Sequence, residues 1–180
     1  MNKKIILAVF AVLIVLSVAL CACTPKENPP STTILDLYDD VNNAKSATQV
    51  ITVKNGTAEI AIETFAYNYE TGKVNIERKT LNSSDADELY TTTTETKNIE
   101  GRNTAKLTAA NLKDVTENET TLTAKVANDK LNTVFGIAAT DVIGDATVKI
   151  VREGEHIVSL TVNYTSANGN TVEIVTNYVY

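Results

Sequence analysis

The chain has 180 residues, of which 43% are hydrophobic and 21% are charged. Its 16 basic and 22 acidic side chains give a formal net charge of −6 at pH 7. Proteins bind nucleic acids through clustered Lys and Arg, so this balance excludes nucleic acid as an expected partner. It also argues against adhesion to anionic lipid head groups through a basic surface.

The N-terminal residues have the pattern of an export signal. Lys3 and Lys4 precede an almost unbroken aliphatic stretch over residues 5–20, and two cysteines follow closely. A membrane-spanning helix needs about 20 apolar residues, and this stretch is shorter than that. We therefore interpret residues 1–22 as a cleaved signal peptide rather than a transmembrane anchor.

Cys23 closes the stretch Leu20-Cys21-Ala22-Cys23, which resembles the lipobox of bacterial lipoproteins: Leu, a variable residue, a small residue and a lipid-modified Cys. Cys21 fits this pattern less well, because Leu20 precedes it where the small residue belongs. The resemblance implies cleavage before Cys23 and a diacylglycerol on its sulfur, with a further acyl chain such as palmitate on its amine in some bacteria. Two or more acyl chains anchor a protein stably.

The same resemblance implies a location. The protein would sit on the extracytoplasmic face of the cell membrane, held there by the lipid at Cys23. In a bacterium with two membranes, Thr24 in place of Asp after this cysteine implies the outer membrane. Loss of the signal removes Lys3 and Lys4 and no acid, so the formal charge changes from −6 to −8. It also removes Cys21, and no disulfide is expected within the mature chain.

Residues 23–33 form the expected link between the lipidated cysteine and the folded domain. All three prolines, Pro25, Pro29 and Pro30, lie in this segment. Proline favours extended polyproline geometry, so we expect a semi-stiff tether. Residues 34–180 contain no proline, which suits a continuous hydrogen-bonded sheet. We expect them to form a single antiparallel β-rich domain and a monomer.

The first folded element is predicted to be a helix over residues 34–45. Thr33 stands at the N-cap position, and Asp36 follows three residues later in the manner of a capping box. Apolar residues recur along this segment at helical spacing: Ile34, Leu37, Tyr38, Val41 and Ala44. Such a stripe needs a sheet to cover it.

From residue 48 onward the hydrophobic period changes to two, which predicts strands. Asn55-Gly56 is a strong hairpin signal, and further turns are indicated near Gly72 and Gly101. The predicted strands in this part of the chain cover residues 49–54, 57–64, 73–81, 89–96, 105–109, 112–116 and 120–127.

A short second helix is predicted over residues 129–135, with Asn128 as its N-cap and Gly136 as its end. Three antiparallel strands in meander order then close the chain. They are predicted over residues 147–151, 157–164 and 172–178, with turns at residues 153–155 and 168–169.

The closing pattern consists of Val148-Lys149-Ile150, His156-Ile157-Val158 and Gly169-Asn170-Thr171-Val172-Glu173. Together with the order of elements, it resembles the LolA/LppX-type family of lipoproteins over roughly residues 34–180. The resemblance implies an α+β fold: a mostly antiparallel, strongly curved sheet, a half-barrel meander, with an N-terminal helix and a short second helix packed on its concave face. It also implies an apolar cavity that binds or ferries acyl chains of a lipid or lipoprotein.

A lipid-binding cavity would be lined by inward apolar side chains. We expect Val74 and Ile76 to continue the face of Ile60 and Ile62. The candidate lining residues are Ile60, Ile62, Val74, Ile76, Leu122, Val126, Val158, Leu160, Val162, Val172 and Ile174. The alternative is that these residues simply fill a core, because alternation shows which face is buried but not whether it is hollow.

No catalytic residue is expected, and we predict that the protein is not an enzyme. His156, the only histidine, lies beside a predicted hairpin turn, which favours an exposed position over a general base. No nucleophile elbow, Walker loop or zinc-protease motif is present. Asp85-Ala86-Asp87-Glu88 lacks the ligand spacing and glycine of an EF-hand, so a solvated turn is the preferred interpretation. We expect no metal and no cofactor.

Phe65, Tyr67 and Tyr69 alternate on the face opposite Ile60 and Ile62. They fit an exposed aromatic stripe for a partner, or a cover for the sheet edge beside the helix, which we prefer. Two functions follow for the whole protein. The first is a membrane-anchored exported lipoprotein that binds a lipid or other hydrophobic ligand. The second is a non-enzymatic cell-surface module that binds a protein or a cell-wall polymer.

Overall fold

The computed structural model describes residues 33–82, 88–102 and 104–180. Thr33–Tyr180 is one compact unit, and it contains every described strand. We therefore expect it to fold without residues 1–32. The predicted signal peptide, the predicted lipidation site Cys23 and the expected tether up to residue 32 lie outside the described residues.

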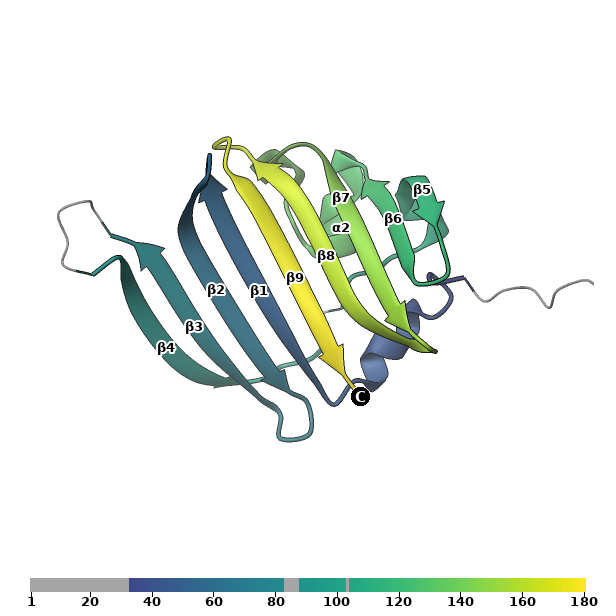
Figure 1. The fold of residues 1–180 in the computed structure, drawn as a ribbon, viewed down its shortest axis with the longest axis horizontal. Coiled ribbons are helices and arrows are strands. Elements are labelled where there is room, and N and C mark those ends of the chain that lie inside the picture. The colour runs from purple at the N-terminus through teal and green to yellow at the C-terminus, as the bar shows by residue number, and fades with distance from the viewer. Residues whose placement is uncertain (1–32, 83–87, 103) are drawn as a thin grey trace, which may run out of the picture. The chain divides into compact units, whose positions relative to one another are not determined.

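The described chain forms one antiparallel sheet of nine strands. Figure 1 views this sheet from the face that carries no helical segments, which lie behind it. Alternation of apolar and polar residues, with no proline to interrupt the ladder, produces these strands. Their bounds are β1 Ser46–Asn55, β2 Ala58–Asn68, β3 Lys73–Leu81, β4 Tyr90–Asn98, β5 Leu112–Glu117, β6 Thr121–Val126, β7 Val142–Glu153, β8 His156–Ser166 and β9 Thr171–Val179.

The spatial order is β4-β3-β2-β1-β9-β8-β7-β6-β5, so two meanders meet in the middle of the sheet. The first strand pairs there with the last: Thr52 of β1 lies opposite Ile62 of β2 on one side and Glu173 of β9 on the other. β4 and β5 are the two edges and do not pair with each other, so the sheet is not closed into a barrel.

The α+β prediction with an N-terminal α-helix is wrong. Residues 34–37 form turns, and η1, Tyr38–Asn43, is a short 3-10 helix. The predicted capping box does form: Thr33 N donates to Asp36 Oδ2 over 3.1 Å, and Asp36 N donates to Thr33 Oγ1 over 3.2 Å. The backbone then continues with the three-residue spacing of a 3-10 helix, as in Tyr38 N to Leu35 O at 3.1 Å.

The polar residues of η1 explain why no α-helix forms there. The Asn42 side chain donates to the Asp39 carbonyl, and the Asn43 side chain donates to Asp40 Oδ1, each over 3.0 Å. Asp and Asn compete in this way with the backbone ladder of a helix. Tyr38 and Val41 are the buried residues of η1, and their three-residue spacing places both on one side of a 3-10 helix.

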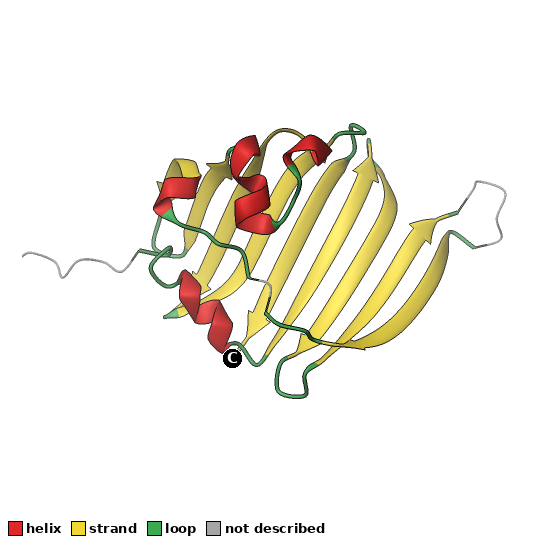
Figure 2. Ribbon diagram, turned by 180° about the vertical axis from the view of Figure 1, so that it is seen from behind, coloured by secondary structure: helices red, strands yellow, loops and turns green. Residues whose placement is uncertain are grey.

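The other helical segments are also short. η3, Asn128–Lys130, runs into α2, Leu131–Phe135, which ends at Gly136 with φ +72° as the sequence predicts. Two single turns, η2 Ala109–Asn111 and η4 Ala139–Asp141, complete the set. Figure 2 shows all helical segments on one face of the sheet, which we call the helical face, over the half that contains β5–β8.

The core lies between these helical segments and the sheet. Residues directly opposite each other in an antiparallel pair point to the same face, and Ile150 opposite Leu160 therefore marks the helical face in β7 and β8. The most completely buried members of the core are Ile34, Val41, Leu122, Val126, Leu131, Ile150 and Ile157. This half of the sheet has a filled core.

Asn128 fastens the η3–α2 segment to the start of β7. Its side-chain amide lies 3.0–3.2 Å from three backbone carbonyls, those of Ala139, Val142 and Gly144. Its backbone N donates to Asp145 Oδ1 over 3.2 Å. The residue predicted as a helix N-cap therefore ties the helix to the sheet instead.

The connection from β4 to β5 crosses the helical face, as Figure 2 shows. Ile99 N donates to the Gly72 carbonyl over 2.9 Å at the start of this crossing segment, residues 99–108. Lys106 N donates to the Val134 carbonyl of α2, also over 2.9 Å. The crossing segment is thus held both at the β2–β3 turn and on α2.

None of the helical segments in the described part of the chain has the length and apolar character that a membrane-spanning helix requires.

Candidate functional site

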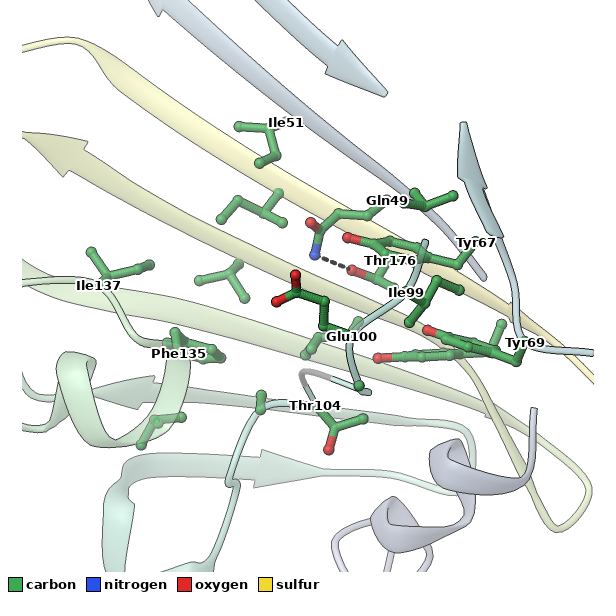
Figure 3. A pocket seen from close by; sticks show the side chains of 18 of the residues that line it. Gln49, Ile51, Tyr67, Tyr69, Ile99, Glu100, Thr104, Phe135, Ile137 and Thr176 are labelled. Atoms are coloured by element: carbon green, nitrogen blue, oxygen red, sulfur yellow. Dashed lines mark hydrogen bonds between the residues drawn. The ribbon is translucent and has the colours of Figure 1, made fainter. Parts of the chain in front are cut away.

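A cavity of about 490 Å³ lies on the helical face, between the middle of the sheet and the crossing segment. Figure 3 shows it from close by, with side chains from the sheet on one side and from the crossing segment and α2 on the other. Small-molecule sites in proteins have volumes of about 300 to 1,000 Å³. The helical segments, which fill the core over β6–β8, leave this space beside it.

The walls of the cavity are aliphatic and aromatic. Strands from both meanders contribute, which is possible only because β1 and β9 are neighbours. Apolar and aromatic lining side chains are Ile51, Tyr67, Tyr69, Val74, Ile99, Val134, Phe135, Ile137, Leu160, Val162, Tyr164, Ile174 and Tyr178. Such a lining suits a ligand with a large apolar body.

A small polar cluster interrupts this lining. Gln49 of β1 donates through Nε2 to Thr176 Oγ1 of β9 over 3.2 Å, and Thr176 is buried. In Figure 3 the Glu100 side chain extends from the crossing segment toward this pair. Thr104 and Asn98 add further polar groups to the lining.

Three aromatic rings stand in a row along β2 and its end. Phe65 and Tyr67 have ring centroids 6.2 Å apart, and Tyr67 and Tyr69 have centroids 5.9 Å apart, with planes inclined by only 13° and 11°. Arg102 of the crossing segment stacks over Tyr69, with Cζ 3.9 Å from the ring centroid. The row therefore joins the cavity wall to the segment that covers it. It lies on the interior strand β2, not at the sheet edge preferred from the sequence.

Burial raises the pKa values of the tyrosines around the cavity. Tyr67, Tyr69 and Tyr164 shift upward chiefly for this reason, and burial raises the pKa of Tyr178 to about 12. These phenols are neutral donors at ordinary pH. The cavity is thus a place where polar groups lose part of their hydration.

Four of the predicted lining residues border the cavity: Val74, Leu160, Val162 and Ile174. Four more are buried without bordering it: Ile76, Leu122, Val126 and Val172. Leu122 and Val126 belong to the filled core over β6. The remaining three, Ile60, Ile62 and Val158, are only partly buried and lie away from the cavity.

Strand register explains why Ile62 is absent from the cavity. Tyr67 lies opposite Val74, and Phe65 lies opposite Ile76, so the aromatic positions of β2 share the helical face with β3. Ile62 alternates with them and points to the outer face of the sheet, and Ile60 lies at the bulge opposite Val53 and Lys54. The sequence expectation that Val74 and Ile76 continue the face of Ile60 and Ile62 is therefore not met.

A bulge explains the position of Val158. Val151 pairs with Ser159 but Arg152 pairs with Ile157, so Val158 is an extra residue in β8. Ile157, which is fully buried, takes the inward position in its place.

Several residues of the site had no sequence signal. In the sequence, Gln49 and Thr176 look like ordinary polar residues of a strand. They form a pair because they lie opposite each other in the β1–β9 ladder. Ile99, Glu100 and Thr104 lie in a segment with no periodicity. Only the topology, which sends residues 99–108 across the helical face, brings them to the cavity.

His156 forms a separate cluster at one end of the sheet. Its Nδ1 lies 2.6 Å from Asp40 Oδ2 of η1, and its ring stacks on Tyr180 with centroids 4.2 Å apart. The Tyr180 hydroxyl donates to the Ile157 carbonyl over 3.0 Å. The His156 side chain is 52% exposed and does not border the cavity. The cluster attaches η1 to the β7–β8 hairpin.

We expect Asp40→Asn to lower stability in a pH-dependent way. The hydrogen bond from His156 holds the pKa of Asp40 below its ordinary value. A carboxyl with a lowered pKa in the folded state contributes stability above its unfolded pKa, and loses it as pH falls through the folded pKa. Thermal unfolding should show a deficit of up to about 1 kcal/mol near neutral pH. Asp39→Asn, beside it in η1, is the matched control; a deficit that persisted undiminished below about pH 3 would contradict this account.

Among the described residues, no group of three or more His, Cys, Asp or Glu side chains could hold a metal ion. Asp85, Ala86 and Asp87 lie outside the described residues, so the solvated turn expected there stays a prediction.

No family model matches the chain, and no curated protein matches it. Similar solved structures include a redesigned β-barrel, mFAP1, bound to DFHBI, with 13% identity over 72% of this chain and 91% of that chain, and a TM-score of 0.22. A second redesigned β-barrel, b11L5F_LGL, has 8% identity over 72% and 87% of the two chains, also with a TM-score of 0.22. The dehydratase domain of RzxB from Pseudomonas fluorescens has 9% identity over 80% of each chain, with a TM-score of 0.20. Likeness at this level carries no argument about the function of this chain.

Proposed function

We propose that the protein is a non-enzymatic binding protein that holds a lipid or other hydrophobic ligand in the cavity on the helical face of its sheet. The observation that carries this proposal is the space of about 490 Å³ bounded by apolar and aromatic side chains. A protein that needed the sheet only as a scaffold would gain stability by filling this space, because voids forfeit packing contacts.

The surroundings of the cavity support the proposal. The crossing segment is fixed over the cavity by backbone hydrogen bonds at Ile99 and Lys106 and by the stacking of Arg102 on Tyr69. On the sheet side, Ile51 and Ile174 are only partly buried, so apolar surface remains available for contact. A preformed apolar site with a few polar groups binds hydrophobic molecules without ordering a new segment.

Native mass spectrometry on residues 24–180, purified without detergent from a bacterial host and followed by solvent extraction, tests the proposal. We expect co-purified lipid or another hydrophobic molecule at close to one per chain. A bare protein mass that stayed unchanged after incubation with phospholipid and with dodecanol would contradict the proposal. That result would favour the cell-surface interaction module.

We further propose that the protein is held at the extracytoplasmic face of a membrane by lipid on Cys23. The lipobox resemblance of residues 20–23 and the proline-containing tether support this proposal. The variant Cys23→Ser should not incorporate a radiolabelled fatty acid in cells and should leave the membrane fraction, because the thioether cannot form. Cys21→Ser is the matched control and should be labelled normally; label that persisted on Cys23→Ser would refute the anchor.

A further inference from the structure

The polar end of the cavity has one charged group. Among the described residues that line the cavity, Glu100 alone carries a charged side chain; the lining contains no Lys, Arg or His. No cation of the described chain forms an ion pair with Glu100. Glu100 is an exposed residue that lines the cavity, and in Figure 3 its carboxylate lies beside the Gln49–Thr176 pair. A ligand that fills the cavity would therefore meet an uncompensated negative charge.

Three cations, Arg78, Lys97 and Arg102, have partners within the described chain. Arg78 of β3 is paired with Glu63, at 3.1 Å, and with Glu95, and Lys97 lies 3.1 Å from Glu95. Arg102 stacks on Tyr69 and donates to the Val41 carbonyl over 3.4 Å, and it is not part of the cavity lining. An anionic head group beside Glu100 would thus meet no cation among the described residues that line the cavity.

A cationic head group would instead be attracted by the charge of Glu100. A protonated amine offers three donors, and the cavity lining offers the Glu100 carboxylate and the Gln49 side-chain oxygen as acceptors. The faces of tyrosine rings also attract cations, as the position of Arg102 over Tyr69 shows in this protein. The chemistry of this end therefore matches a cation and disfavours a carboxylate or phosphate.

We propose that the ligand is a hydrophobic amine, with its alkyl or aryl body against the apolar walls of the cavity and its protonated amino group at Glu100. This inference rests on the proposed function and specifies its ligand class. The carboxylate supplies the selectivity for a cationic head group. Apolar walls alone contact the alkyl chain and do not distinguish head groups of different charge.

Three probes with the same alkyl chain separate these contributions: dodecylamine, dodecanol and laurate. Each is used below its micelle concentration to displace the neutral dye N-phenyl-naphthylamine from residues 24–180, which contain the whole compact unit. We expect dodecylamine to bind at least about tenfold more tightly than laurate, as charge-assisted hydrogen bonds allow. Dodecanol, which lacks a charge, should lie between them.

The variant Glu100→Gln tests the named residue. It should lower the affinity for dodecylamine by about tenfold and leave that for dodecanol within about twofold. Glu155→Gln removes the same charge at an exposed turn outside the cavity lining and is the matched control. It should leave the binding of all three probes unchanged.

The possible outcomes are distinct. If laurate binds as tightly as dodecylamine, or if Glu100→Gln leaves the affinity for dodecylamine unchanged, the amine assignment is overturned while the cavity remains a binding site. If the dye does not bind, or if none of the three probes displaces it, the proposed function itself fails.

Discussion

The variant Ile174→Trp should abolish binding of hydrophobic ligands while the protein remains folded. Ile174 borders the cavity and is only partly buried, so the larger indole has space to enter it. We expect the affinity for dodecanol to fall by more than about tenfold. The stability should change by less than about 1 kcal/mol, whereas overpacking a filled core typically costs about 1 to 3 kcal/mol.

The neighbouring residue supplies the control for this variant. Val175 lies on the same strand but pairs with Val50 and Thr161 on the outer face of the sheet. Val175→Trp should therefore bind dodecanol normally. Because the natural chain has no tryptophan, the fluorescence of each introduced indole also reports its surroundings. Unaltered dodecanol binding by Ile174→Trp would mean that the cavity is not the site.

The variant Asn128→Asp should destabilise the protein more than any other single change discussed above. The amide of Asn128 faces three backbone carbonyls at 3.0–3.2 Å. Removing a donor from partly buried acceptors costs about 1 to 3 kcal/mol, which we expect for Asn128→Ala. The aspartate should cost more than the alanine, because its carboxylate places negative charge against the same oxygens. Urea unfolding of both variants at neutral pH measures the difference.

The pH dependence of Asn128→Asp gives an independent check. The carbonyls disfavour the charged form, so the pKa of the new carboxyl should be raised in the folded state. A group with a raised folded pKa loses stability as pH rises through that pKa, so part of the deficit relative to Asn128→Ala should disappear on acidification. Asn132→Asp, on the exposed side of α2, is the control and should unfold nearly like the natural protein. Equal stabilities of the alanine and aspartate variants at all pH values would disprove this account.

Most strands of this fold could be predicted, because alternation and turn residues act over short distances. The strand predicted over residues 105–109 was wrong, because these residues belong to the crossing segment and the start of η2. Thr121–Val126 and the closing strands β7, β8 and β9 follow patterns of period two that are visible without any tertiary information. The N-terminal helix was predicted wrongly for a related reason. A spacing of three or four residues fits a 3-10 turn as well as an α-helix, and the Asn42 and Asn43 side-chain bonds decide between them.

The cavity could be predicted only in part, because its position depends on register and connection. Leu160 and Val162 alternate in β8 and were predicted to face inward, as they do. Val158 follows the same alternation but is displaced by a bulge, which no feature of the single strand reveals. Glu100 reaches the cavity because the crossing segment joins opposite edges of the sheet, and a long-range connection of this kind leaves no local pattern.

The pairing of β1 with β9 has a consequence for the order of synthesis. Residues 46–55 leave the ribosome long before residues 171–179, although Thr52 and Glu173 lie side by side in the finished sheet. Closing so long a loop is slow, and topologies dominated by such contacts fold slowly. Until the last strand has been made, β1 and β8 each keep an unpaired edge in what will become the centre of the sheet. A chain truncated before β9 would consist of two separate meanders, and the cavity, whose walls come from both, would not yet exist.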